Sequence, residues 1–112
     1  MKLVAHLNDI PDGRFLRVEV DGEMIALHRS GPEVFAIAAS CPHRGGPLDE
    51  GEVEDGVVNC PWHGWAFDVR TGRCVVPEGC RPQKVWDVHV IDSEVHLDET
   101  SGRAGDPAPE EQ

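Results

Sequence analysis

Short runs in which apolar and polar residues alternate, separated by turns rich in Gly, Pro and Asp, constrain the fold of this chain more than any other feature. Alternation with a period of two is the pattern of a half-buried strand, and an Asp-Gly pair between two such runs predicts a hairpin. The runs span residues 15–20, 23–27, 33–39, 51–60, 65–76 and 83–97, with turns at Asp21-Gly22, Ser30-Gly31-Pro32, Asp55-Gly56, Thr71-Gly72 and Asp92-Ser93. Because no stretch keeps the helical period of 3.6, we expect an all-β protein, an antiparallel β-sandwich or small barrel.

The end of the chain has a different composition from the rest. A length of 112 residues suits one domain. The strand pattern ends near residue 98, and residues 99–112 contain Gly, Pro, Ala and acidic residues but almost no large apolar ones. Such a segment cannot bury enough surface to offset the entropy lost on ordering it. We therefore expect a domain over residues 1–98 and a disordered acidic tail over residues 99–112.

The chain is strongly acidic, with a formal net charge of −11. This charge argues against nucleic-acid binding, which needs a basic surface, and favours docking to a basic protein surface. No run approaches the roughly 20 apolar residues of a membrane span, and the first residues lack the pattern of a signal peptide. We expect a cytoplasmic protein that does not enter a membrane.

Two segments interrupt the strand pattern, CPHRGGPL at residues 41–48 and CPWHGW at residues 60–65. Each contains one cysteine and one histidine, and together they give the spacing C-x-H-x16-C-x2-H with Cys41, His43, Cys60 and His63. Cysteines in a cytosolic chain serve metals or catalysis more often than disulfides. The remaining histidines, His6, His28, His89 and His96, have no neighbouring cysteine at such a spacing, and we expect them to be structural or exposed.

Three kinds of site remain possible for these four residues. A structural zinc ion accepts two thiolates and two imidazoles, although zinc sites usually pair Cys with Cys and His with His. A cysteine–histidine nucleophile pair would use one residue of each type and leave the duplication unexplained. A two-iron cluster uses all four, with both thiolates on one iron and both imidazoles on the other.

The segments CPHRGGPL and CPWHGWAFD resemble the two ligand boxes of Rieske [2Fe–2S] proteins, and the resemblance covers most of the chain. It implies one [2Fe–2S] cluster, with Cys41 and Cys60 on the inner iron and His43 and His63 on the outer iron. It also implies a cluster-binding subdomain built on these two loops, over about residues 40–82. A protein of this kind is an electron carrier and not an enzyme in itself.

Departures from the respiratory branch of this family bear on the reduction potential. Respiratory members have a disulfide cysteine in each box, where this chain has Gly46 and Trp62, and they place hydroxyl groups where this chain has Trp65 and Phe67. Hydrogen bonds to cluster sulfur stabilise the reduced state, so the loss of two hydroxyl donors lowers the potential. The chain therefore resembles the low-potential ferredoxins of aromatic-ring oxygenases.

The resemblance implies a monomer that carries one electron at a time from a flavoprotein reductase to a terminal oxygenase. The alternative is the small subunit of an assimilatory nitrite reductase, or another enzyme-bound module that serves a large reductase subunit. Residues for partner docking or cluster shielding are Arg44, Trp62, Trp65 and Cys80. A local bridge between Cys74 and Cys80 is possible, but the cytosolic redox poise favours a thiol at each position.

Overall fold

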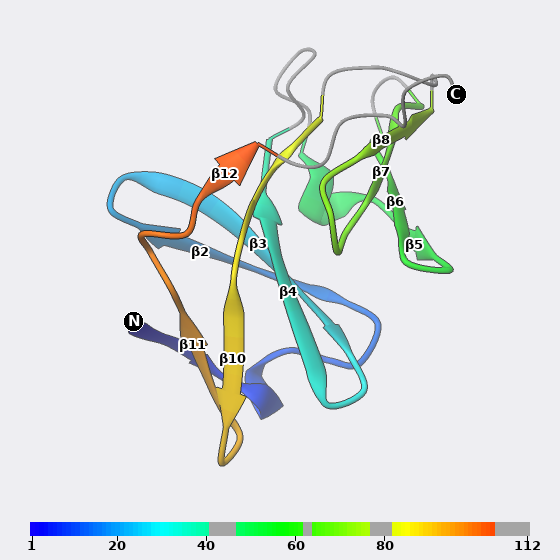
Figure 1. The fold of residues 1–112 in the computed structure, drawn as a ribbon. Coiled ribbons are helices and arrows are strands. Elements are labelled where there is room, and N and C mark those ends of the chain that lie inside the picture. Colours follow the sequence, from blue (N-terminus) through cyan, green and yellow to red (C-terminus); the bar gives the residue numbers. More distant parts are fainter. Residues whose placement is uncertain (41–46, 62–63, 77–81, 105–112) are drawn as a thin grey trace, which may run out of the picture.

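The protein folds as three antiparallel sheets, seen here in a computed structural model that describes residues 1–40, 47–61, 64–76 and 82–104 (Figure 1). The expected all-β class is confirmed. The two helices in the described residues are single 3-10 turns, η1 (Leu7–Asp9) and η2 (Leu48–Glu50). No helix in that part of the chain is long and apolar enough to cross a membrane.

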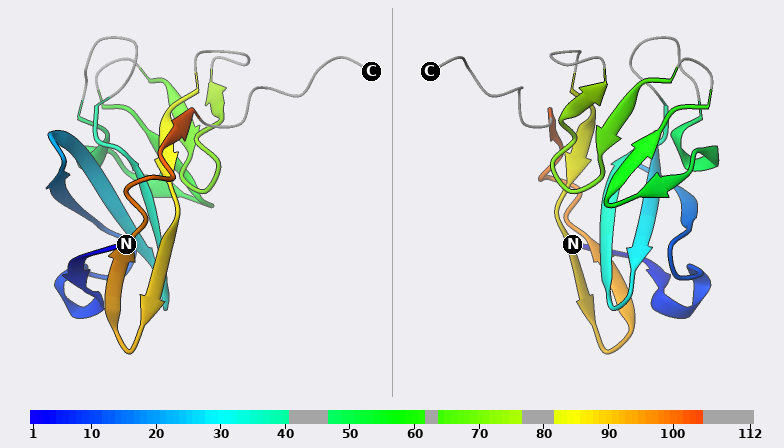
Figure 2. Two further views of the ribbon diagram at one scale, coloured as in Figure 1. Left: turned by 60° about the vertical axis from the view of Figure 1, so that its left-hand side comes forward. Right: turned by 90° about the vertical axis from the view of Figure 1, so that its right-hand side faces the viewer.

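The largest sheet has five strands in the order β12-β9-β4-β3-β2, and the other two have three and four strands. The five strands are β2 (Phe15–Val20), β3 (Glu23–Ser30), β4 (Glu33–Ala38), β9 (Lys84–Trp86) and β12 (Arg103–Ala104). The three-stranded sheet contains β1 (Lys2–His6), β11 (Glu94–Leu97) and β10 (Val88–Ile91). The four-stranded sheet contains β5 (Val53–Glu54), β6 (Val57–Asn59), β7 (Ala66–Asp68) and β8 (Cys74–Val76). This last sheet lies at the opposite end of the molecule from the β10–β11 turn (Figure 2).

The Asp-Gly turns form as the sequence predicts. At the β2–β3 turn, φ is 51° at Asp21 and 82° at Gly22, and at the β5–β6 turn it is 52° at Asp55 and 78° at Gly56. Positive φ at both central residues is the geometry whose twist matches that of the paired strands, and Asp followed by Gly tolerates it well. The Asp92-Ser93 turn between β10 and β11 has the same sign at both residues.

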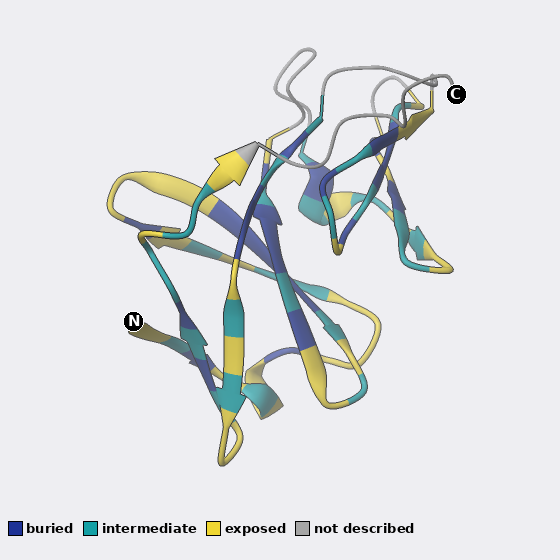
Figure 3. Ribbon diagram, viewed as in Figure 1, coloured by how far each residue is buried: buried dark blue, intermediate teal, exposed yellow. Residues whose placement is uncertain are grey.

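Buried residues of the five-stranded sheet belong to two cores among the described residues, and Figure 3 shows buried stretches along β3 and β4. The sandwich core lies against the three-stranded sheet and includes Ile25, Leu27, Val95 and Leu97. The junction core lies against the four-stranded sheet and includes Ala26, Ile37, Val58 and Phe67. Successive residues of β3 point into different cores, because side chains alternate across a strand.

Two strands are predicted over residues 83–97, and the first of them, before the Asp92-Ser93 turn, is divided between two sheets. β9 pairs with β4, with Val85 opposite Ile37, whereas β10 pairs with β11. The chain changes sheets at Asp87, whose backbone N–H donates to the Ser101 hydroxyl at 2.7 Å instead of to a neighbouring strand. The strand β1, which pairs with β11, is not among the strands that the alternation pattern predicts.

The five-stranded sheet extends beyond residue 98, where we expected the domain to end. In β12, Arg103 pairs with Val85, and its guanidinium lies 3.1 Å from the carboxylate of Asp87. Gly102 lies so close to Trp86 that an added Cβ would be 2.5 Å from the indole nitrogen. The expected tail boundary is therefore wrong for residues 99–104, because a small residue and polar contacts hold this segment without apolar burial. Residues 105–112 lie outside the described part of the chain.

His28 of β3 is a buried polar residue at the junction core side of the sheet. It is 4% exposed, its ring lies 4.9 Å from that of Phe15, and its Nδ1 is buried without a hydrogen-bond partner. Burial lowers the pKa of His28, although a hydrogen bond to the backbone of Arg14 and the charge of Asp12 act in the opposite direction. The expectation of a structural role is consistent with this burial.

We expect the free energy of unfolding to fall as the pH is lowered from 7 towards 5, in part through His28. The unfolded chain binds a proton near the ordinary pKa of about 6.5, whereas the folded protein resists it, so stability present above that pH is lost below it. The slope from this residue is at most about 1.4 kcal/mol per pH unit. Urea denaturation at several pH values should show a flatter profile for His28→Phe than for wild type. Parallel profiles for the two proteins would show that His28 contributes nothing to the pH dependence.

Candidate metal centre

Cys60 begins the second predicted ligand segment, directly after β6. Its side chain is 2% exposed, forms no disulfide and belongs to the junction core. The backbone N–H of Cys60 donates to the carbonyl of Trp65 at 2.6 Å, and the N–H of Gly64 donates to the carbonyl of Cys60 at 3.2 Å. These bonds join Cys60 to Gly64 and Trp65, and the Cys60 side chain is buried in the core.

The first predicted ligand segment is held at both ends. Ser40 and Pro47 form an isolated antiparallel bridge, and the N–H of Leu48 donates to the carbonyl of Ala39 at 2.8 Å. The N–H of Ala39 in turn donates to the carbonyl of Met24 at 3.0 Å, at the start of β3. The residues on either side of positions 41–46 are therefore joined to each other and to the five-stranded sheet.

A bidentate ion pair fixes η2, which follows the first segment. Arg17 of β2 donates from Nη2 to Oδ1 of Asp49 at 2.7 Å and from Nε to Oδ2 at 3.1 Å. The Asp49 side chain is only 16% exposed, so this pair is screened less than an ordinary surface pair. It anchors the chain between the two ligand segments to the edge of the sheet.

Both segments start from the junction core. Ala39 and Leu48 flank positions 41–46, and both lie in the same group of buried residues as Cys60. Trp65, at the end of the second segment, packs against this group. The buried Cys60 thiol therefore lies beside the ends of the first segment, which also contains Cys and His. This donor set fits a cluster with thiolate ligands inside and imidazole ligands outside.

Trp65 is the last residue of the second segment, and Phe67 lies two residues later in β7. Their ring centroids are 6.3 Å apart, with Phe67 fully buried in β7 and Trp65 partly exposed. Phe67 pairs with Val58, two residues before Cys60. The surroundings of Cys60 are therefore apolar at both positions where the respiratory proteins have hydroxyl groups.

The other predicted site residues, Cys41, His43, Arg44, Trp62, His63 and Cys80, lie outside the described residues. Within the described residues, no group of three or more His, Cys, Asp or Glu side chains could hold a metal ion. Cys74 is buried in β8 and disulfide-bonded, so the expected thiol at that position is wrong. The expectation rested on the redox poise of a compartment, whereas local geometry decides which sulfurs can pair.

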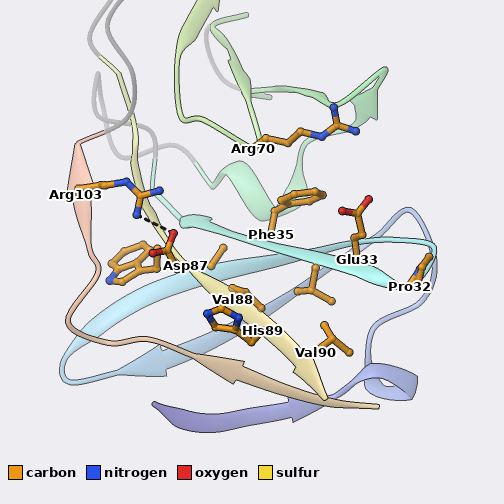
Figure 4. A pocket seen from close by; sticks show the side chains of 12 residues that line it. Pro32, Glu33, Phe35, Arg70, Asp87, Val88, His89, Val90 and Arg103 are labelled. Atoms are coloured by element: carbon orange, nitrogen blue, oxygen red, sulfur yellow. Dashed lines mark ion pairs between the residues drawn. The ribbon is translucent and has the colours of Figure 1, made fainter. Parts of the chain in front are cut away.

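An open groove of about 510 Å³ runs between β4 and the β9–β10 segment (Figure 4). The Arg70 guanidinium lies over the ring of Phe35, 5.6 Å from its centroid, on one side of the groove. On the other side Arg103 pairs with Asp87. Cys60, the one predicted ligand among the described residues, does not line this groove.

Two described residues near the ligand segments were missed by the sequence analysis. Gly51 ends η2, and an added Cβ there would overlap the carbonyl oxygen of Asn59, directly before Cys60. Gln83 is buried beside the end of β4. Neither gives a local signal, because Asn59 is eight positions from Gly51 and the carbonyls that Gln83 binds are 43 and 45 positions away.

An all-β fold, with Cys60 buried at the start of one of two segments that each contain Cys and His, is typical of small β-sheet proteins that carry a metal cluster. A family model described as the Rieske [2Fe-2S] domain matches residues 1–88. This chain belongs to that family, whose cofactor is a Rieske-type [2Fe–2S] cluster.

Curated relatives include the 3-phenylpropionate/cinnamic acid dioxygenase ferredoxin subunit of Shigella boydii serotype 4 (strain Sb227). It is 34% identical over 91 residues, which are 80% of this chain and 85% of that protein. Apoptosis-inducing factor 3 of Homo sapiens is 38% identical over 69 residues, 62% of this chain, and the match spans only 11% of that much longer protein.

The solved structures that are similar to this chain also include ferredoxins. The ferredoxin of carbazole 1,9a-dioxygenase from Nocardioides aromaticivorans IC177 has a TM-score of 0.80 and 31% identity, covering 97% of each chain. A chain from a complex of reduced oxygenase and oxidised ferredoxin in carbazole 1,9a-dioxygenase has a TM-score of 0.78 and 32% identity, covering 86% of this chain and 99% of its own. A nitrite reductase small subunit from Mycobacterium tuberculosis, with a TM-score of 0.78, is 21% identical, covers 93% of this chain and 95% of its own, and is similar in fold alone.

Proposed function

We propose that this chain is a low-potential Rieske ferredoxin, a one-electron carrier and not an enzyme in itself. Cys41 and Cys60 are the proposed thiolate ligands, and His43 and His63 the proposed imidazole ligands of one [2Fe–2S] cluster. The observation that carries the proposal is the burial of Cys60 in the same core as Ala39 and Leu48, the residues that flank positions 41–46. We propose that the domain includes β12 and that its cluster-binding part is about residues 40–82.

When bound, the cluster supplies a reversible one-electron step. The chain positions the ligands, excludes water from them and sets the polarity of their surroundings. The junction core excludes water around the Cys60 sulfur, and the turn bonds at Cys60, Gly64 and Trp65 fix the backbone on which that sulfur is carried. Arg44, Trp62, Trp65 and Cys80 are the residues that we assign to shielding or partner docking.

The proposed partners are a flavoprotein reductase as electron donor and a terminal aromatic-ring oxygenase as acceptor. Two observations support them: the similarity to ferredoxin subunits of dioxygenases over most of both chains, and the net charge of −11, which suits basic partner surfaces. We propose that the protein acts as a monomer in the cytoplasm and binds neither nucleic acid nor a membrane.

The second candidate function is the small subunit of an assimilatory nitrite reductase, which the shared fold supports. The two functions differ in what they bind. A ferredoxin is purified from its native cell as a free monomer and accepts electrons from a flavoprotein, whereas a subunit is purified in a fixed ratio with a large reductase. Size-exclusion chromatography of the native extract, followed by iron analysis of the fractions, separates the two.

A redox titration monitored by EPR tests the proposed function. We expect a Rieske signal on reduction and a midpoint in the lower part of the family range of about −150 to +300 mV. The reason is the apolar pair at Trp65 and Phe67, which offers no hydroxyl donor. A midpoint above about +100 mV would contradict the low-potential assignment, and the absence of a Rieske signal would contradict the function.

The matched variant is Phe67→Tyr, which adds one hydroxyl beside the same core. One hydrogen bond worth about 1 kcal/mol more in the reduced state corresponds to a rise of about 40 mV for a one-electron couple. The control is Phe15→Tyr, which adds the same group at the edge of the junction core, where the midpoint should not change.

A further inference from the structure

Gln83 is a buried polar residue that joins two sheets. The residue is only 3% exposed. Its side-chain Nε2 donates to the carbonyl of Ala38 at 3.0 Å and also to the carbonyl of Ser40. Its backbone N–H donates to the carbonyl of Gly72 at 2.7 Å, in the turn between β7 and β8. The amide therefore uses both of its N–H donors on one strand end, while the backbone holds a turn of the four-stranded sheet.

The side chain of Gln83 takes the place of missing strand pairing. β4 and β9 are paired at Ala36 with Trp86 and at Ile37 with Val85, and the pairing stops there. Beyond that point the register pairs neither Ala38 nor Ser40 with a residue of β9. The Gln83 amide is itself buried, and a buried amide without partners is costly. Its two bonds to the end of β4 satisfy these donors at the point where the strand pair has ended.

The carbonyls that Gln83 binds lie directly before the first ligand segment. Between them, Ala39 donates to the carbonyl of Met24 and accepts from the N–H of Leu48. The last three residues before position 41 are thus each fixed by a hydrogen bond, and Gln83 supplies two of the three carbonyl contacts. The turn at Gly72 follows β7, which pairs Ala66 with Asn59 beside Cys60.

We propose that Gln83 is a positioning residue for the iron–sulfur cluster, setting the end of β4 before Cys41 relative to the sheet that carries Cys60. This inference rests on the proposed function, because it takes Cys41 and Cys60 as the ligands. Gln83 does not touch the ligand sulfur of Cys60 through any contact in the described residues. It acts through the backbone on which the first ligand segment begins.

The test compares Gln83→Met with Val95→Ala in purified, cluster-loaded protein. Methionine keeps the length of the side chain and removes both donors, whereas Val95 is fully buried in the sandwich core, on the other side of the five-stranded sheet. The readouts are the rate of iron loss to a chelator, the EPR line shape of the reduced protein, and stability in urea. We expect Q83M to lose iron about tenfold faster than wild type with an altered EPR line shape, as for other residues that orient ligands from outside the coordination shell.

The V95A protein should be less stable in urea than wild type but lose iron at the wild-type rate with an unchanged EPR spectrum. If Q83M, like V95A, loses iron at the wild-type rate and has an unchanged EPR spectrum, Gln83 is merely structural and the inference is overturned. If Q83M does not fold, Gln83→Asn provides the same comparison, because its shorter amide cannot reach both carbonyls. Wild-type iron loss and EPR in Q83N would also overturn the inference. A wild-type protein without a Rieske signal would overturn the proposed function and this role together.

Discussion

Replacement of Cys60 by alanine is expected to give a colourless protein without a Rieske EPR signal and with almost no bound iron. Wild type should contain about two iron atoms per chain, the content of one [2Fe–2S] cluster. The Cys60 sulfur is buried in the junction core and forms no disulfide, so the substitution breaks no disulfide bond. Loss of one of two thiolate ligands leaves one iron with an incomplete coordination shell. Iron analysis, the visible spectrum and EPR of the reduced protein measure the effect.

The control for this prediction is Val58→Ala, which removes a buried side chain from the same core two residues earlier. Val58 is fully buried in β6, so we expect this variant to be destabilised by about 1–3 kcal/mol through the cavity that it leaves. It should nevertheless retain iron and the EPR signal. A C60A protein with the iron content of wild type would show that Cys60 is not a ligand, and an iron-free V58A protein would show that core packing alone accounts for the loss.

The strand pattern of the sequence predicted most of the fold because it follows local rules. FLRVEV at residues 15–20 is β2, and the Asp21-Gly22 pair forms the turn with positive φ at both residues that its composition predicts. The division at Asp87 could not be predicted, since alternation with period two is the same whether consecutive strands share a sheet or not. At that point the Asp87 N–H donates to Ser101, a residue in the segment that the composition predicts to be a tail.

The candidate ligands were predicted from residue type and spacing, and the comparisons place the chain in the matching family. The residues that support them were not predicted. Gln83 contacts carbonyls 43 and 45 positions away, so a single sequence gives no reason to prefer it over any other polar residue. Its importance is visible only once β4 and β9 are seen to separate. Burial of a polar group and the end of a strand pair are tertiary facts, and no local pattern encodes them.

Replacement of Gly51 by alanine is expected to destabilise the protein by about 3 kcal/mol or more and to reduce its iron content. The backbone at Gly51 has φ of −80° and ψ of 166°, which alanine adopts without strain. The obstacle is steric, since a Cβ would overlap the carbonyl oxygen of Asn59 and lie 3.2 Å from that of Leu48. Both neighbours are backbone atoms, which cannot rotate away as a side chain can. Relief of the overlap therefore moves Asn59, and with it Cys60, the next residue in the chain.

The matched control is Gly13→Ala, which separates steric overlap from backbone strain. Gly13 has φ of +78° with nothing within 4 Å of an added Cβ, so we expect a loss of about 1 kcal/mol from the left-handed conformation alone. Both variants remove the same backbone freedom from the unfolded chain, so this contribution cancels when they are compared. Urea denaturation gives the stabilities, and iron content reports on the site. Since Gly13 is outside both ligand segments, G13A should retain its iron. If G51A were no less stable than G13A and kept its iron, the close approach of η2 to β6 would have no part in holding Cys60.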